Sequence, residues 1–202
     1  MARRARPRQR GAAVVRPVRG DGGGVGGAAV RWALSNRADP AARAVADRHY
    51  NRQHVGADQF VPPGKCLVLY AATETGVALW ISHAPDPRFV KHRWPGAWVC
   101  TAFRNEGAWL SSELIREALA ATVDAWGPPP AEGMLTFVDP TKTAPKEVPG
   151  WCFRRAGFKS DGFSEGGLVA LVLPARRFPA PSPPLWRGVD ARWDTRQQGL
   201  FR

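Results

Sequence analysis

The stretch from Ala97 to Trp126 constrains the fold of this chain more than any other part of the sequence. Residues 97–103 form an apolar, aromatic and β-branched run, which is typical of a buried strand. Polar residues at 104–107 predict a turn, and residues 111–126 repeat apolar positions at the three- and four-residue steps of an amphipathic helix. A strand and a helix with apolar surfaces must bury them against each other or against further elements. The sequence therefore predicts an α/β fold built around this unit.

The ends of the predicted helix carry their own signals. Ser111 is a candidate N-cap, and Glu113 places negative charge in the first turn, where the helix dipole favours it. Gly127 and the three prolines after it end the helix. The face predicted to be buried consists of Leu114, Ile115, Ala118, Leu119, Thr122 and Trp126.

A strand that leads through a glycine-containing turn into a helix N-terminus can form an anion site. Free backbone N–H groups and the helix dipole point at one place, which a phosphate typically occupies. The alternative is a turn that binds no ligand. The candidate cofactor-binding residues of this unit are Arg104, Asn105, Gly107, Ser111 and Ser112.

Length and composition exclude several classes of protein. The 202 residues suffice for one domain with a proper core, and no apolar run is long enough to span a membrane. The arginine-rich N-terminus lacks the apolar segment of a secretory signal. Cys66, Cys100 and Cys152 are odd in number and widely spaced, a pattern typical of a reduced, cytoplasmic protein. The four histidines show no metal-binding spacing, so we expect no metal site.

The net charge of +12 lies mostly outside the middle of the chain. Residues 1–29 carry seven Arg and one Asp, residues 174–202 carry six Arg and two Asp, and residues 30–173 have a net charge of only +2. Basic tails can contact phosphates whatever the base sequence. The alternative is that the arginines follow from a biased coding composition. We predict disordered basic tails at 1–29 and 174–202 around one folded domain at 30–173.

Periodicity and turn signals predict seven strands and three helices in that domain. Two long loops, at residues 51–64 and 83–96, separate some of them, and such loops are often functional. The predicted strands are at residues 30–34, 66–71, 77–82, 97–103, 134–138, 158–163 and 168–173, and the predicted helices begin at Asp39 or Pro40, at residue 111 and at residue 151.

The loop at residues 83–96 mixes basic and aromatic side chains. This mixture suits a polynucleotide, because cations meet phosphates while rings stack on bases. The alternative is a lid that packs its aromatic side chains on the core. Two lysines on the loop after residue 138 could add phosphate contacts. The candidate DNA-binding residues are Arg88, Phe89, Lys91, Trp94, Lys142 and Lys146.

The order of the elements, β-α-β-β-β-α-β-α-β-β, resembles that of the GNAT acyltransferases. The segment Arg104-x-x-Gly107-x-Trp109 is similar to the loop that binds the pyrophosphate of coenzyme A in that family, with Trp109 in place of a small residue. Residues 152–158 resemble the family's Tyr-x-x-x-Gly-Phe ending, with Phe153 in place of the Tyr that acts as general acid. The resemblance implies a mixed, mostly antiparallel sheet flanked by helices, and acetyl-CoA or a related acyl donor.

Within that superfamily the chain is most similar to the Mom-type DNA-modification proteins of bacteriophages and their relatives. The resemblance covers residues 40–173 and implies a transferase that modifies adenine N6 in double-stranded DNA, shielding phage DNA from host restriction enzymes. It implies a cytoplasmic location, in the host for a phage-encoded chain. The similarity lies in His49-Tyr50, in Phe103-Arg104-Asn105-Glu106 with Leu110-Ser111-Ser112-Glu113, and in Phe137-Val138-Asp139-Pro140.

Three residues are candidate catalytic groups. Asp139 follows a strand at the edge where open α/β sheets place ligands, and its carboxylate could hydrogen-bond or deprotonate an exocyclic amine. His49 and Tyr50 could supply a base and a proton donor. Asp139 could instead cap its own turn, and the His49-Tyr50 pair could simply pack and cap the helix. Cys152 could replace the missing acid, or it could be a small core residue.

Three classes of function stay open on the sequence. The first is a Mom-like transferase, the second an ordinary GNAT enzyme that acetylates a small amine or a protein, and the third a non-catalytic DNA-binding protein. An electropositive groove near Asp139 would favour DNA, whereas a narrow acidic pocket would favour a small amine. The family resemblance requires strands 97–103 and 134–138 to be parallel neighbours, joined through the helix at 111–126.

Overall fold

The central hairpin of the fold forms where apolar runs flank a short polar turn. β2 (Lys65–Ala72) and β3 (Val77–Ala84) pair antiparallel along their whole length, which confirms the predicted hairpin. The amide of Thr73 donates to the carbonyl of Gly76 at 2.8 Å and closes the turn. Residue 76 has to be glycine, because a Cβ there would lie 1.9 Å from the backbone oxygen of Glu106.

The computed structural model describes residues 31–143 and 148–185. It has a mixed α/β fold with one mostly antiparallel sheet, as predicted. The seven strands lie in the order β1-β2-β3-β4-β5-β7-β6. The predictions for residues 1–29 and 186–202 lie outside the described residues. The other elements are β1 (Ala33–Ser35), α1 (Pro40–Asp47), η1 (Pro87–Phe89), β4 (Trp98–Glu106), α2 (Ser111–Trp126), β5 (Met134–Val138), α3 (Trp151–Arg155), β6 (Lys159–Phe163), β7 (Val169–Leu173) and η2 (Ala175–Arg177).

β4 and β5 lie side by side and run parallel, joined through α2. The other neighbouring strand pairs of the sheet are antiparallel. The predicted adjacency of these two strands is therefore confirmed. Their pairing is short, from Trp98 opposite Met134 to Cys100 opposite Thr136, so the two strands separate before either of them ends.

β4 is longer than predicted, and the turn predicted at 104–107 is wrong at its start. Arg104 and Asn105 still pair with β3, so the strand continues to Glu106. Pairing satisfies the backbone N–H and C=O groups of both strands, and this outweighs the polar character of the side chains. The chain turns only at Gly107, which has a φ of 86°.

Two further strands begin later than predicted, and in each case the residue just before the strand is a large side chain buried in the core. The first strand begins at Ala33 rather than residue 30. Trp32 is fully buried there, and its indole N–H donates to the Leu114 carbonyl at 2.8 Å. β6 begins at residue 159 because Phe158 packs edge-on against Phe153, with ring centroids 5.2 Å apart.

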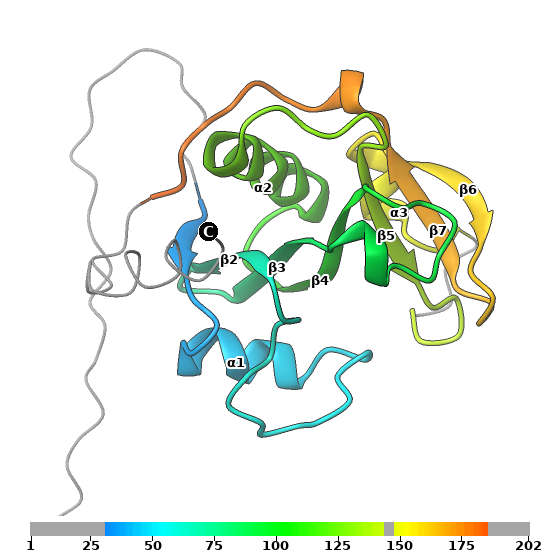
Figure 1. Ribbon diagram of the computed structural model, residues 1–202. Helices are drawn as coiled ribbons and strands as arrows, with labels where there is room; N and C mark the ends of the chain where they lie inside the picture. The colour runs from blue at the N-terminus through cyan, green and yellow to red at the C-terminus, as the bar shows by residue number, and fades with distance from the viewer. Residues whose placement is uncertain (1–30, 144–147, 186–202) are drawn as a thin grey trace, which may run out of the picture.

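The helices cover both faces of the sheet, as predicted. Figure 1 shows α2 on one side of the strands and α1 on the other. The buried face of α2 contains the predicted residues 114, 115, 118, 119 and 122, while Trp126 is half-buried edge-on against Trp98. α1 begins where predicted, since the Asp39 side chain caps the amide of Ala41 at 2.8 Å. Its buried residues Ala42 and Val45 pack on β2 and β3.

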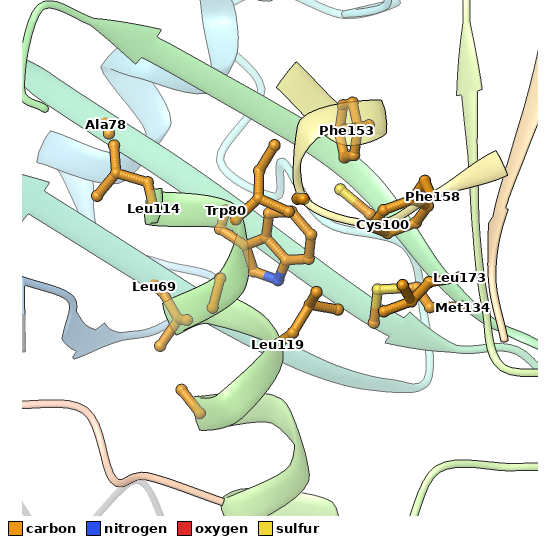
Figure 2. Close-up of a cluster of buried hydrophobic side chains, with 14 of the residues drawn as sticks. Leu69, Ala78, Trp80, Cys100, Leu114, Leu119, Met134, Phe153, Phe158 and Leu173 are labelled. Carbon is orange, nitrogen blue, oxygen red and sulfur yellow. The ribbon is translucent and has the colours of Figure 1, made fainter. Parts of the chain in front are cut away.

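The core between the sheet and α2 is centred on Trp80 of β3 (Figure 2). Its indole N–H donates to the Ser82 hydroxyl at 2.7 Å, and that hydroxyl lies 2.8 Å from the Thr122 hydroxyl. Thr122 in turn donates to the Ala118 carbonyl at 2.7 Å. The side chains of Trp80, Ser82 and Thr122 are thus all hydrogen-bonded, and these bonds offset the cost of burying their polar atoms. The network also fixes α2 against β3.

The prediction that the chain leaves the fold at Pro174 is wrong for residues 174–185. Phe178 packs edge-on against Trp98, with centroids 5.9 Å apart, and the Ser182 amide donates to the Ala120 carbonyl of α2. Leu185 then pairs in parallel with Ala33 at the edge of the sheet. The segment crosses over α2 in Figure 1. Phe178 packs on the core and the backbone of Leu185 covers the β1 edge, which outweighs the proline-rich composition of the segment.

Candidate functional site

A bulge in β4 lies beneath the C-terminal end of α1. Ser82 pairs with Cys100 and Ile81 pairs with Ala102, so Thr101 is an extra residue on β4. A bulge leaves backbone groups outside the ladder. The carbonyl of Thr101 accepts a hydrogen bond at 2.9 Å from the side-chain amide of Asn51, which follows α1. The bulge thus anchors the segment that contains two of the predicted catalytic residues.

The predicted catalytic residues His49, Tyr50 and Asp139 come together at the opening between β4 and β5. Beyond Thr136, β5 no longer pairs with β4 and ends at Val138. The backbone amide of Asp139 donates to the Tyr50 hydroxyl at 3.4 Å, and the His49 and Tyr50 rings stack with centroids 4.5 Å apart. Residues 89 positions apart in the sequence therefore meet at one edge of the sheet.

Tyr50 presents a proton donor at this opening. Its oxygen accepts the bond from Asp139, so its own O–H proton is available to another group. Partial burial raises the pKa of Tyr50 above its usual value of about 10. The phenol is therefore protonated at neutral pH. The side chain is exposed by 40%, so a substrate can reach it.

His49 is buried and held in one orientation by Asn51. Because the Asn51 amide nitrogen donates to Thr101, its side-chain oxygen faces Nδ1 of His49. A proton on Nδ1 satisfies this short contact, whereas the 3.3 Å approach of the Asn51 backbone amide to the same nitrogen needs the opposite tautomer. The ring also has a backbone hydrogen bond to Phe103. Burial lowers the pKa of His49, which favours the neutral imidazole.

The carboxylate of Asp139 is exposed and caps its own turn. One oxygen, Oδ1, accepts from the Thr141 amide at 2.8 Å and from the Thr141 hydroxyl at 2.7 Å. The hydroxyl and the amide of Thr141 together lower the pKa of Asp139 below its usual value. The turn-capping geometry considered as the alternative is therefore present. It uses Oδ1 and leaves the charged group facing solvent beside the Tyr50 hydroxyl.

A hollow of about 240 Å³ adjoins His49 beneath the loop that follows α1. Its described lining includes imidazole, amide and guanidinium groups but no Asp or Glu, so it offers no carboxylate to a cationic amine. The residues that line it are Ala46, His49, Asn51, Arg52, Gln53, His54, Gln59, Phe60, Val61, Pro62, Ile81, Thr101 and Ala102.

The loop between β4 and α2 is closed by Asn105. The amide nitrogen of its side chain donates to the Trp109 carbonyl at 2.6 Å and to the Ser111 hydroxyl at 2.9 Å. Its side-chain oxygen accepts from the Ala108 amide at 3.0 Å. Ser111 is consequently not the N-cap that was predicted. Leu110 occupies the N-cap position and, being apolar, makes no capping bond, while the Ser111 hydroxyl accepts a hydrogen bond from Asn105.

The predicted phosphate ligands of this loop are occupied or covered. Nε of Arg104 lies 2.5 Å from Glu106, which also binds Arg48 at 2.6 Å, and the two guanidiniums hold the pKa of Glu106 down to about 2. Ser112 is buried. The Arg31 guanidinium lies 5.6 Å from the centre of the Trp109 ring, at the position where a small residue would let a phosphate approach. These residues do not fit the pyrophosphate of coenzyme A.

Phe153 has a structural role. Its ring is buried among aromatic neighbours, 5.7 Å from Phe103 and 5.2 Å from Phe158, measured between centroids. A phenylalanine ring has no acidic proton, and this ring is also buried, so Phe153 cannot serve as a proton donor. The neighbouring Cys152 is half-buried.

The candidate DNA-binding residues on the 83–96 loop divide into two groups. Trp94 packs on Phe137, with centroids 5.9 Å apart, so it behaves as the core-packing alternative describes. Arg88, Phe89 and Lys91 are exposed. Lys142 is exposed on the turn after Asp139, whereas Lys146 lies outside the described residues.

Sequence reasoning missed Asn51 and Thr101. Asn51 lies two residues after His49, and this spacing lets a side-chain amide reach the imidazole, but its second partner is 50 residues away. The extra residue in β4 leaves no sign in the strand's composition. Of these two residues, only Asn51 could have been proposed from the sequence, because it lies two residues after His49.

Comparison with models of known protein families, with curated protein sequences and with solved structures found no match. Within residues 31–143 and 148–185, no helix is long and apolar enough to cross a membrane. In the same residues, no group of three or more His, Cys, Asp or Glu side chains is arranged to hold a metal ion.

Proposed function

We propose that this chain is a Mom-like transferase of GNAT type that modifies the N6 amine of adenine in double-stranded DNA. The observation that carries the proposal is the contact between Tyr50 and Asp139 where β4 and β5 separate. The parallel adjacency of these strands, which the resemblance requires, supports it further. A proton donor and a carboxylate then flank a single exposed point at the sheet edge, as transfer to an amine needs.

Asp139 acts on the acceptor. The N6 amine of adenine is a poor nucleophile because its lone pair is delocalised into the ring. The Asp139 carboxylate is ionised at neutral pH, and its Oδ2 accepts a hydrogen bond from N6–H while Oδ1 holds the turn. When N6 bonds to the carbonyl carbon of an acyl donor, the bond from that carbon to its leaving group would break. The Asp139 carboxylate would stabilise the positive charge on N6 and take its proton, and the Tyr50 O–H would protonate the leaving group. Such assistance is worth about a hundredfold or more in rate.

Tyr50 and His49 form the other side of the acceptor site. Tyr50 supplies the proton donor that Phe153 cannot be, since its O–H is free and the phenol stays protonated at neutral pH. His49 stacks on Tyr50 and fixes the orientation of the phenol. The neutral imidazole adds no positive charge that would compete for the Asp139 carboxylate.

Adenine within a duplex cannot reach this edge, so the base must be flipped out of the stack. The hollow beside His49 has a mixed apolar and polar lining without carboxylates, which suits a neutral heterocycle better than a cationic amine. This property favours a nucleobase over the small amine of an ordinary GNAT acetyltransferase. The buried Phe153 also argues against that second class.

The proposal concerns the acceptor side of the reaction. The loop at 107–111 is closed by Asn105 and covered by Trp109, so coenzyme A has no binding position there in the proposed reaction. The same closure favours one competing function, a non-catalytic DNA-binding protein that has kept the fold. The two functions differ in whether DNA from cells that contain the protein carries a modified nucleoside.

The test is mass spectrometry of nucleosides from plasmid DNA of cells that express the chain. A modified deoxyadenosine that disappears with Asp139→Asn supports the transferase. Unmodified DNA, together with tight DNA binding by the purified protein, supports the non-catalytic alternative instead. Unmodified DNA and no DNA binding would remove both.

A further inference from the structure

The loop at residues 85–96 has one packed half and one exposed half. In the packed half, the Trp94 indole N–H donates to the Asp161 carboxylate at 2.5 Å, and Arg93 donates to the Asp161 carbonyl. His92 lies edge-on to Phe137, with centroids 5.6 Å apart. Phe137 precedes Asp139 by two residues on β5, so the loop is fixed to the strand that leads into the candidate site.

The exposed half holds Phe89 in solvent on a stiff turn. The ring is 78% exposed, the largest exposed fraction among the bulky apolar side chains that the structure describes. The Asp86 side chain caps the turn by accepting from the Arg88 amide at 3.0 Å, and the Phe89 amide donates to the Asp86 carbonyl at 3.0 Å. Pro87 fixes its own φ angle within the turn. The ring cannot easily fold back onto the protein.

One cation lies beside this ring. The Arg88 guanidinium lies 5.6 Å from the ring centre, and its side chain is 81% exposed although it pairs with Asp86. Lys91, two residues further along the chain, is also exposed. An exposed ring beside a cation matches a step of a nucleic-acid duplex, where apolar base faces lie between phosphates. A protein interface or an anionic membrane would be the competing partners.

We propose that Phe89 inserts between stacked bases of double-stranded DNA, next to the adenine that is flipped toward Tyr50 and Asp139. This inference rests on the proposed function, because it takes DNA as the partner of the same site. Apolar side chains, Phe among them, act as wedges that unstack a base step. A wedge fills the space that the flipped base leaves, so part of the cost of flipping is offset.

The experiment measures binding of the full chain to a duplex that contains 2-aminopurine beside the target adenine, without any donor present. Fluorescence anisotropy reports affinity, and 2-aminopurine emission reports unstacking. Phe89→Ala should weaken binding about fivefold or more and should abolish the rise in emission. Phe163→Ala is the matched control, since Phe163 is a 65% exposed Phe on β6, and it should change neither signal. Phe89→Leu keeps an apolar wedge and should retain part of both signals.

Salt dependence separates insertion from phosphate contact. Phe89→Ala should lower the affinity by the same factor at every salt concentration, because stacking releases no counterions. Lys91→Ala should reduce the slope of log K against log salt by about one. The basic tails contribute equally to all variants and so cancel from the comparison.

Two results would overturn the proposal. The first is unchanged emission and affinity in Phe89→Ala. The second is a loss of self-association, or of binding to anionic vesicles, in Phe89→Ala without any effect on DNA. Because no donor is present, insertion can be found even if no modified nucleoside forms, and a modified nucleoside formed by Phe89→Ala at the wild-type rate would refute insertion alone.

Discussion

Two loops at the same edge of the sheet, one after β4 and one after β5, differ in what their polar groups contact. After β4, Asn105 binds Trp109, Ser111 and Ala108, and the loop is closed on itself. After β5, the Asp139 carboxylate bonds within its own turn, to Thr141 through Oδ1 and to the backbone of Lys142, and the neighbouring Tyr50 hydroxyl keeps its proton free.

This difference indicates which of the two loops is the better candidate for contact with a substrate. Polar groups that are satisfied within the fold add stability, whereas exposed groups held in fixed positions are available to a substrate. The loop after β4 resembles a cofactor loop in sequence but has the contacts of a structural one. The edge after β5, together with the end of α1, has the exposed polar groups that the proposed acceptor site requires. The following substitutions test this contrast.

Asp139→Asn should have the largest effect. Asn keeps an oxygen that can accept from Thr141, so the turn remains, but the negative charge that stabilises a developing cation is lost. We expect modification of adenine to fall by about a hundredfold or more while DNA binding and stability stay close to wild type. Nucleoside mass spectrometry and anisotropy measure the two quantities. Modification at the wild-type rate would reduce Asp139 to a turn residue.

Tyr50→Phe should reduce modification by about ten- to a hundredfold, since it removes the available proton but leaves the ring stacked on His49. Cys152→Ala is the companion variant, because Cys152 is the other candidate for the missing acid. Rates under single-turnover conditions distinguish them. A large loss in Cys152→Ala with a normal rate in Tyr50→Phe would transfer the role to the thiol.

Asn105→Ala should lower the free energy of unfolding by about 1–3 kcal/mol, because the buried Ala108 amide loses its acceptor. Asn105→Asp keeps that acceptor and loses the two donated bonds, so its cost should be smaller. Chemical denaturation measures both variants. Calorimetry with coenzyme A should detect no tight binding to the wild-type protein, and micromolar affinity would break the contrast between the two loops.

The smallest expected effect is on the pH dependence of stability. Burial lowers the pKa of His49 in the folded state below its unfolded value near 6.5, so the folded state favours the neutral imidazole. Stability should therefore fall as pH decreases from about 6.5 through the folded pKa, by about 1.4 kcal/mol for each unit of pKa difference. His49→Gln should remove part of this slope in thermal melts at pH 5 to 7. A slope unchanged from wild type would show that His49 is not buried in solution.

Much of the architecture could be predicted because it depends on local patterns. Apolar alternation around a polar turn predicts the β2–β3 hairpin, and steps of three and four residues predict the buried face of α2. The catalytic candidates could be proposed because His49, Tyr50 and Asp139 lie at the ends of predicted elements. The proline-rich composition after residue 173 led to a wrong prediction. Composition indicates the backbone preference of a segment, but it does not indicate whether that segment packs on the folded domain.

The sequence by itself determined the elements and their faces, because these follow from periodicity, whereas the parallel step from β4 to β5 was expected from the family resemblance. Only the tertiary structure decided which polar side chains are already hydrogen-bonded within the fold and which remain available to a substrate. Asn105 and Tyr50 are both polar residues at the end of an element, and nothing local separates them. One finds its partners within six residues, and the other meets an amide 89 residues away. Such long-range pairing depends on how the whole sheet assembles, which no short pattern encodes.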